Sequence, residues 1–274
     1  MGVWIMAGVT FREAARKKVL WMALAAGCAF LVLFGAGLHY QVKDLAGANS
    51  IVRRQVPNAM LIVGIYAVDL LAMVITVLAS ADTLSGEIAS GTIHAVATKP
   101  VTRWEVLLGK WLGFVGMMTL YIGLMVAGVA CLAWFLSGAT ALHLCWGVLL
   151  IWLESIVLLN VTLLCGASLS TLTSGVLVLG LYALAFLGGW IEQVGALTRS
   201  PRVVDVGVIA SIIMPSESLW RRAAFEMQSP VVGALRISPF SNASVPSAAM
   251  IGYAVAYLAI ALALAGRSFG ARDL

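Results

Sequence analysis

Long apolar runs separated by short polar segments dominate the pattern of the chain. Six runs are about 17 residues or longer, the length at which a helix can cross about 30 Å of hydrocarbon. Their predicted limits are 19–38, 59–81, 106–136, 144–168, 175–191 and 246–266. The pattern therefore predicts an all-α polytopic membrane protein that forms a single transmembrane domain over residues 1–274. The third run is so long that we expect it to tilt, bend or project beyond the bilayer.

Composition supports the membrane assignment. Of the 274 residues, 62% are hydrophobic and only 11% are charged, and the mean hydropathy is +1.01. A soluble domain with so little charge would have no polar surface to present to water. The four cysteines lie in or beside apolar runs without C-x-x-C spacing, which predicts buried small apolar residues and no metal site. They are Cys28, Cys131, Cys145 and Cys165.

The residues before the first run predict an amphipathic helix at the membrane interface, over positions 1–18. Trp4, Ala7, Phe11 and Ala14 form its apolar side, and Arg12, Glu13, Arg16 and Lys17 form its polar side. The basic residues Arg12, Arg16, Lys17 and Lys18 favour a cytoplasmic N-terminus, because positive charge is retained on that side of the membrane. Six crossings then place the C-terminus and residues 82–105 in the cytoplasm, and 39–58 and 192–245 outside.

The segment 192–245 is rich in proline, so we expect no continuous spanning helix there. Residues 203–214 are apolar but too short to cross, which favours a re-entrant or surface-lying piece. Residues 216–228 predict a short helix with two ion pairs at i, i+4 spacing. The predicted pairs are Glu217 with Arg221, and Arg222 with Glu226.

Small residues recur along the third run at spacings of three and four, interrupted only by Leu120. They are Gly109, Gly113, Gly116, Gly123, Ala127 and Ala130. Such a stripe lets a second helix approach closely, which is how helices associate in lipid. We expect it to pack against another helix, within the chain or in a second copy.

Acidic residues occur inside the apolar runs. Asp69 shares one face of the second run with Tyr66, Met73, Thr76 and Ser80. An aspartate at that depth must face protein or water, so Asp69 and Thr76 predict either a translocation path or a helix anchor. Glu154 in the fourth run is a similar acidic residue, at a shallower depth in the membrane than Asp69. Glu192 is expected to be a solvated residue at the boundary of the fifth run.

The polar segment between the second and third runs reads LSGEIASGTIHAVATKPVTRWEVLLGK over 84–110. Its serines and glycines, Ser85, Gly86, Ser90, Gly91 and Thr92, predict a break in the preceding helix. Pro100 ends any short helix before it. Thr102 and Glu105 form a capping box that starts the third run.

This segment resembles a signature of ATP-binding-cassette (ABC) transporter permeases of the second exporter type. The signature is E-x-x-x-G-T, then P-V-x-R-x-E, then G-K. In that family the permease is a dimer, and the cytoplasmic element between spans two and three docks onto a separate ATPase. The resemblance assigns coupling to the ATPase to Glu87, Ser90, Gly91, Thr92, Ile93, Pro100, Arg103 and Glu105. The chain departs from the pattern at His94 and Ala95, where relatives carry larger apolar residues.

Gly109 and Lys110 are followed by Trp111, so they are not part of a phosphate-binding loop. The chain is therefore expected to bind no cofactor and to catalyse no reaction by itself, while a partner uses ATP and Mg²⁺. The resemblance implies two ATP-binding subunits, a second permease copy, membrane lipid and an extracytoplasmic accessory protein as partners, and no nucleic acid. It also implies the inner membrane of a prokaryote.

Two alternatives to an ABC exporter stay open. A secondary transporter or channel would more often show related halves, and the chain has no internal repeat. A membrane-embedded serine hydrolase is suggested only by Gly166-Ala-Ser168, which resembles a rhomboid-like motif. That chemistry needs a histidine at membrane depth, and His39, His94 and His143 lie in loops or at the ends of runs.

Overall fold

The computed structural model describes residues 2–16, 18–90, 102–229 and 244–271, and these residues form helices and short connections. The elements are α1 (Gly2–Arg16), α2 (Lys18–Asp44), the 3-10 helix η1 (Leu45–Gly47), α3 (Ser50–Ser90), α5 (Arg103–Ser137), α6 (Leu144–Gly166), α7 (Thr171–Leu197), α8 (Pro201–Ile213), α9 (Ser216–Met227) and α11 (Ala249–Gly270). Within this described part, α2, α3, α5, α6, α7 and α11 are long and apolar enough to cross a membrane. The predicted all-α polytopic fold with six spans is confirmed.

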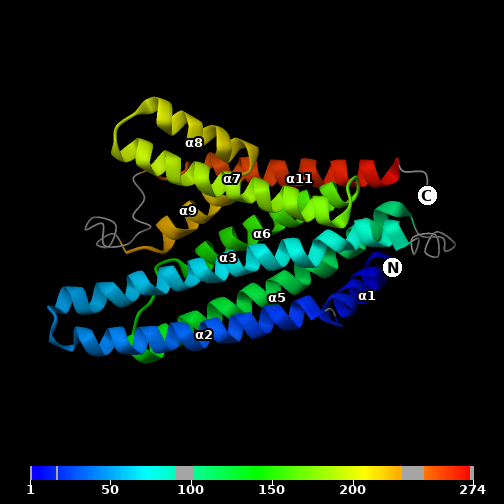
Figure 1. Cartoon of the computed structure of the whole chain (residues 1–274). Coiled ribbons are helices and arrows are strands. Elements are labelled where there is room, and N and C mark those ends of the chain that lie inside the picture. Colours follow the sequence, from blue (N-terminus) through cyan, green and yellow to red (C-terminus); the bar gives the residue numbers. More distant parts are fainter. Residues whose placement is uncertain (1, 17, 91–101, 230–243, 272–274) are drawn as a thin grey trace.

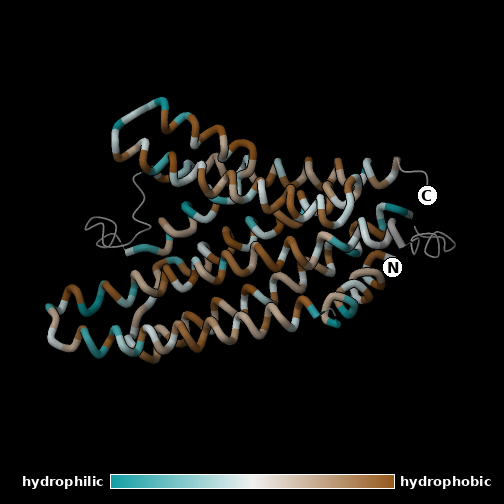
Figure 2. Tube along the Cα trace, in the orientation of Figure 1, coloured by the Kyte–Doolittle hydropathy of each residue, from teal (hydrophilic) through white to brown (hydrophobic). Residues whose placement is uncertain are grey.

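The long helices run alongside one another as an elongated bundle (Figure 1). The two termini, the end of α3 and the start of α5 lie at one end of it, and the α2–α3 connection lies at the other. Apolar residues predominate along the spanning helices, as Figure 2 shows. The two termini therefore share an end of the bundle with the segment that joins α3 to α5.

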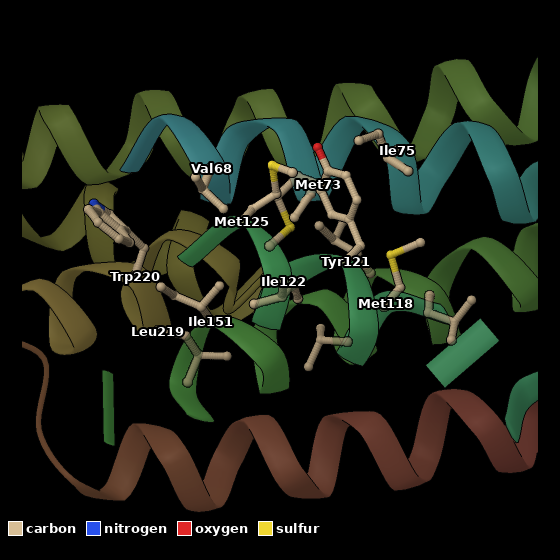
Figure 3. Packing of buried hydrophobic residues seen from close by; sticks show 14 of the residues in the cluster. Val68, Met73, Ile75, Met118, Tyr121, Ile122, Met125, Ile151, Leu219 and Trp220 are labelled. Carbon is tan, nitrogen blue, oxygen red and sulfur yellow. The ribbon is translucent and has the colours of Figure 1, made fainter. Parts of the chain in front are cut away.

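Helices α3 and α6 form the centre of the bundle. In their most apolar stretches, 61% and 67% of the residues are buried, against 11% for α2 and 22% for α11. Figure 3 shows part of the buried core. Met73 of α3 and Met125 of α5 belong to it, and Trp220 of α9 lies at one edge of this view. The outer faces of α2 and α11 are apolar and exposed, as suits contact with lipid.

The predicted loop 39–58 is wrong. Helix α2 continues to Asp44 and α3 begins at Ser50, so only a short connection separates them. Pro57 lies inside α3. Proline has no N–H to donate to the carbonyl four residues earlier, and the surrounding turns tolerate this loss within a helix of 41 residues.

The predicted loop 192–245 is partly wrong, because α7 continues as a helix to Leu197. Helices α8 and α9 follow and meet at a bend of 106°. The prediction that this region carries short helices instead of a continuous span fits this elbow. The Arg222–Glu226 ion pair is present at 2.6 Å.

The first helix forms as predicted, and the two alanines of its predicted apolar side pack against the protein together with Thr10. Ala7, Thr10 and Ala14 are buried, while Trp4 is 76% exposed. Small residues pack because α1 lies close against α5, which leaves no room for the indole of Trp4. The exposed Trp4 and Ile5 suit a helix at a membrane interface.

The prediction that the cysteines are buried is wrong for three of the four. Cys28, Cys131 and Cys145 are exposed, and Cys165 is half-buried. They lie on outer faces of spanning helices, where an apolar thiol is as well tolerated by lipid as by a protein core.

Candidate functional site

Helix α3 continues unbroken from the bundle to Ser90, so the predicted break at Ser85 and Gly86 is wrong. The hydroxyl of Ser85 donates to the carbonyl of Ala81 at 2.6 Å and lies 2.8 Å from the hydroxyl of Thr171 on α7. A serine that bonds back to its own helix in this way does not interrupt it. Ser85 also joins the end of α3 to the start of α7.

The resemblance to ABC permeases assigns coupling to residues in and after this last part of α3. Glu87 and Ser90 have helical backbone, and their side chains lie outside the described part of the chain. Gly91, Thr92, Ile93 and Pro100 lie outside the described residues. Their role in coupling stays a prediction.

The capping box at the start of α5 is confirmed. The hydroxyl of Thr102 accepts from the backbone N–H of Glu105 at 3.3 Å, and the N–H of Thr102 donates to the Glu105 carboxylate at 2.9 Å. Reciprocal bonds of this kind satisfy N–H groups that have no partner within the helix. They fix the direction in which the chain enters α5.

Residues just after the cap join α5 to the last helix. The guanidinium of Arg103 donates to the carbonyls of Phe269 and Gly270 at 3.2 and 3.1 Å. These carbonyls belong to the last turn of α11, where a cationic donor is favourable. The Trp104 ring lies over Gly266, where a Cβ would clash with it.

Lys110 joins α5 to α3. Its side chain is 3% exposed, and its ammonium group donates to the carbonyl of Thr83 at 3.0 Å. We call Thr102, Arg103, Trp104, Glu105 and Lys110 the α5 junction. Through this junction and Ser85, helices α3, α5, α7 and α11 are connected at the end of the bundle where α3 ends and α5 begins.

A second group of polar residues lies inside the bundle. Asp69 of α3 and Glu154 of α6 are 1% and 0% exposed. Their charges interact with each other and with that of Glu217 on α9. Glu154 is therefore as buried within the protein as Asp69, and its shallower depth in the membrane stays a prediction. The rings of Tyr66 and Trp220 pack at a tilt of 39° with centroids 4.8 Å apart, which places α9 against α3.

Thr76 lies on the same helix but does not join this group. Its hydroxyl donates to the carbonyl of Ala72 at 2.7 Å and lies 3.0 Å from the sulfur of Met118. The structure thus places Asp69 with Glu154, and places Thr76 in the contact between α3 and α5.

Glu192 is not a solvated boundary residue. It is 5% exposed, and its carboxylate lies 2.7 Å from the guanidinium of Arg221 and accepts from Ser244 at 2.6 Å. Arg221 therefore pairs with Glu192 of α7, and the predicted pair with Glu217 is wrong. Glu217 packs instead over Gly189, which leaves room for its side chain.

Sequence reasoning missed Asn160, which connects three helices. It is fully buried on α6, accepts from the indole N–H of Trp111 at 2.6 Å and donates to the carbonyl of Leu258 at 3.0 Å. A lone asparagine in an apolar run is the signal that could have found it, because a buried amide requires partners.

With this geometry established, the chain can be compared with known proteins. The model of the ABC-2 family transporter proteins matches residues 4–274. The chain belongs to this family. No curated protein matches it. The permease assignment made from the signature is thus confirmed over nearly the whole chain, and the α5 junction is part of the membrane component of a transporter.

The small-residue stripe on α5 has different neighbours at its two ends. Gly109 packs against Met6, and a Cβ on Gly113 would lie 2.8 Å from Cβ of Thr10, so the first helix covers this part. Gly116 and Gly123 are exposed, and around Gly123 no neighbouring atom of the described residues lies within 4 Å of a Cβ position. Packing of Gly116 and Gly123 stays a prediction, now for a second chain or lipid.

The contacts of the stripe also give the direction of α1. Gly2 lies beside Glu105, Met6 beside Gly109 and Thr10 beside Gly113. Equal steps of four residues on both helices mean that α1 runs parallel to the first turns of α5. The permease thus carries its first helix on the same turns that form the α5 junction.

Ser168, the residue suggested for a hydrolase, hydrogen-bonds Ser268 at 2.8 Å. This contact joins the α6–α7 connection to α11. It adds to the helix contacts at this end of the permease.

Proposed function

We propose that this permease is the transmembrane subunit of an ATP-driven exporter, in which a separate ATP-binding subunit hydrolyses ATP. The observation that carries the proposal is the continuity of α3. It is a single helix of 41 residues, about 60 Å long at 1.5 Å per residue. It leads from Asp69 in the bundle interior into residues 82–105, which we call the coupling segment. A displacement of the end of α3 is therefore transmitted along one continuous helix.

The α5 junction supports the same proposal. The coupling segment enters α5 at the capping box, and Lys110 and Arg103 bind the first turns of α5 to α3 and α11. A force on this segment therefore moves several spanning helices together and not one alone. Such coordinated movement is what opening a path between helices requires.

Partners follow from the family and from the arrangement of the chain. We infer a second permease copy and two ATP-binding subunits, which supply ATP and Mg²⁺ chemistry. Both termini lie at the end of the bundle where the coupling segment begins (Figure 1), so this end is assigned to the cytoplasm of a prokaryotic cell. The α7–α8 connection, which lies toward the opposite end (Figure 1), then faces the extracytoplasmic side and offers a surface to an accessory protein.

The test begins with the complex. The permease is co-expressed with its ATP-binding subunit, and native mass spectrometry measures the subunit ratio, with two of each expected. ATP turnover in proteoliposomes is then measured across lipids, glycan precursors, peptides, drugs and ions, and the exported compound is expected to raise it.

Two results would overturn the proposal. One is a permease that purifies without any ATP-binding subunit. The other is solute flux that needs no ATP, which would favour the secondary transporter or channel instead.

A further inference from the structure

Three carboxyl groups from three helices meet inside the bundle. Asp69, Glu154 and Glu217 are each 6% exposed or less. Both oxygens of Asp69 and both of Glu154 are buried and have no hydrogen-bond partner among the described residues. The charges of Asp69, Glu154 and Glu217 all act on Tyr182 of α7, which places the four side chains in one region.

An ionised carboxylate is costly in this setting and requires a positive partner. Arg221 is the basic residue whose charge acts on Glu217, and it is engaged with Glu192 at 2.7 Å. The described residues contain no group of three His, Cys, Asp or Glu side chains arranged to hold a metal ion. Neutralisation by protons is the alternative that needs no further ligand.

Among the described residues, the titratable and charged side chains that interact with Asp69 and Glu154 or with Glu217 come from three helices. They are Tyr66 of α3, Tyr182 and Glu192 of α7, and Glu217 and Arg221 of α9. The surroundings of the pair are thus phenolic and acidic, and the guanidinium of Arg221 is shared with Glu192.

A pocket of about 240 Å³ lies beside Glu192 and Arg221, whose charges act on Glu217. It is lined by Glu192, Ser211, Ser218, Arg221, Ser244 and further residues of α8 and α11. Glu192 and Arg221 line this pocket and act on Glu217, and Glu217 in turn interacts with Glu154 and Asp69. Ionisable side chains therefore lead from the pocket to the centre of the bundle.

We propose that Asp69 and Glu154 form a proton-binding pair, and that Glu217 connects this pair to the pocket beside Glu192 and Arg221. Each carboxylate takes up one proton from hydronium in the aqueous solution, which becomes water, and the side chain becomes a neutral carboxylic acid. A protonated carboxyl group gains an O–H donor, so the two side chains can then hydrogen-bond each other. The site binds protons independently of ATP and of the proposed coupling to a partner.

Infrared difference spectroscopy of the purified permease tests the pair. The spectrum of Asp69→Asn/Glu154→Gln is subtracted from that of the unmodified protein at neutral pH. We expect a carboxylic-acid C=O band that the double variant loses and each single variant loses in part. The exposed Asp205 of α8 provides the control, since Asp205→Asn should leave the band unchanged. The amide side chains keep the shape of the acids, and circular dichroism verifies folding.

Transfer into heavy water tests the connection through Glu217. We expect Glu217→Gln to slow the deuterium shift of the band severalfold, while Glu226→Gln on the same helix leaves its rate unchanged. Absence of the carboxylic-acid band from the unmodified protein would overturn the proton-binding pair. An unchanged exchange rate in Glu217→Gln would overturn the connecting role.

Discussion

The ammonium nitrogen of Lys110 on α5 lies 3.0 Å from the backbone carbonyl oxygen of Thr83 on α3, and the lysine side chain is 3% exposed. The two helices are therefore joined near the end of α3 and the start of α5. A hydrogen bond from a charged donor is stronger than one between neutral groups. This contact holds the first turns of α5 against the last turns of α3.

Removing the ammonium group of Lys110 should weaken the contact between α5 and α3. We expect Lys110→Met to lower the free energy of unfolding by about 1.5 to 3 kcal/mol, because a buried hydrogen bond from a charged group is lost while the apolar stem is kept. Denaturant titration of the permease in detergent measures the change. Lys43→Met is the matched control, since Lys43 is exposed at the far end of α2. Equal stabilities of the two variants would show that the Lys110 contact contributes nothing.

The stripe on α5 should respond differently at its two ends. A leucine at Gly113 meets Thr10 and the carbonyl of Ala7, both within 3 Å of a Cβ. We expect Gly113→Leu to displace α1 and to destabilise the permease by about 1 to 3 kcal/mol, as overpacking does.

Gly123→Leu is the comparison, because among the described residues no atom lies within 4 Å of a Cβ position at Gly123. Its unfolding midpoint as a monomer should match that of the unmodified permease. Thermal denaturation and limited proteolysis of α1 distinguish the two variants. If Gly113→Leu leaves α1 as protected as before, the packing described for this helix is incorrect.

Two neighbouring arginines of α9 form ion pairs that differ in burial, and these pairs allow a matched test. The side chains of Arg221 and Glu192 are 4% and 6% exposed, whereas those of Arg222 and Glu226 are 23% and 19% exposed. Removing one partner of a buried pair leaves an uncompensated charge and costs about 3 to 5 kcal/mol. We expect this loss for Glu192→Gln.

The half-buried pair should matter much less. Exposed pairs contribute at most about 1 kcal/mol, so Glu226→Gln should remain close to the unmodified permease in the same denaturant titration. A larger loss for Glu226→Gln than for Glu192→Gln would contradict the burial of the Glu192 pair.

The spans and the capping box were predictable because their signals are local. An apolar run of sufficient length has few alternatives to a spanning helix. Thr102 and Glu105 are three residues apart, so their reciprocal bonds can be predicted from spacing alone. The Arg222–Glu226 pair was found for the same reason.

Other features depend on contacts between distant residues. Arg221 has Glu217 at i, i+4 spacing, but Glu192 lies on α7 and is brought to it by the α8–α9 elbow. Ser85 would favour a break in an isolated segment, yet its hydroxyl bonds back to Ala81 and reaches Thr171. Tertiary contacts outweighed local preference in both cases.

ATP hydrolysis by the complex of permease and ATP-binding subunit tests the coupling role of α3 most directly. The comparison is between the unmodified complex, Glu87→Gln at the end of α3 and the control Asp205→Asn on α8. Glu87 is the acid of the family signature, and Gln keeps its size while removing its charge. We expect Glu87→Gln to retain the ATP-binding subunit but to lose most of the substrate-stimulated ATP turnover and transport, with Asp205→Asn unchanged. A Glu87→Gln complex that transports at the unmodified rate would contradict coupling through the end of α3.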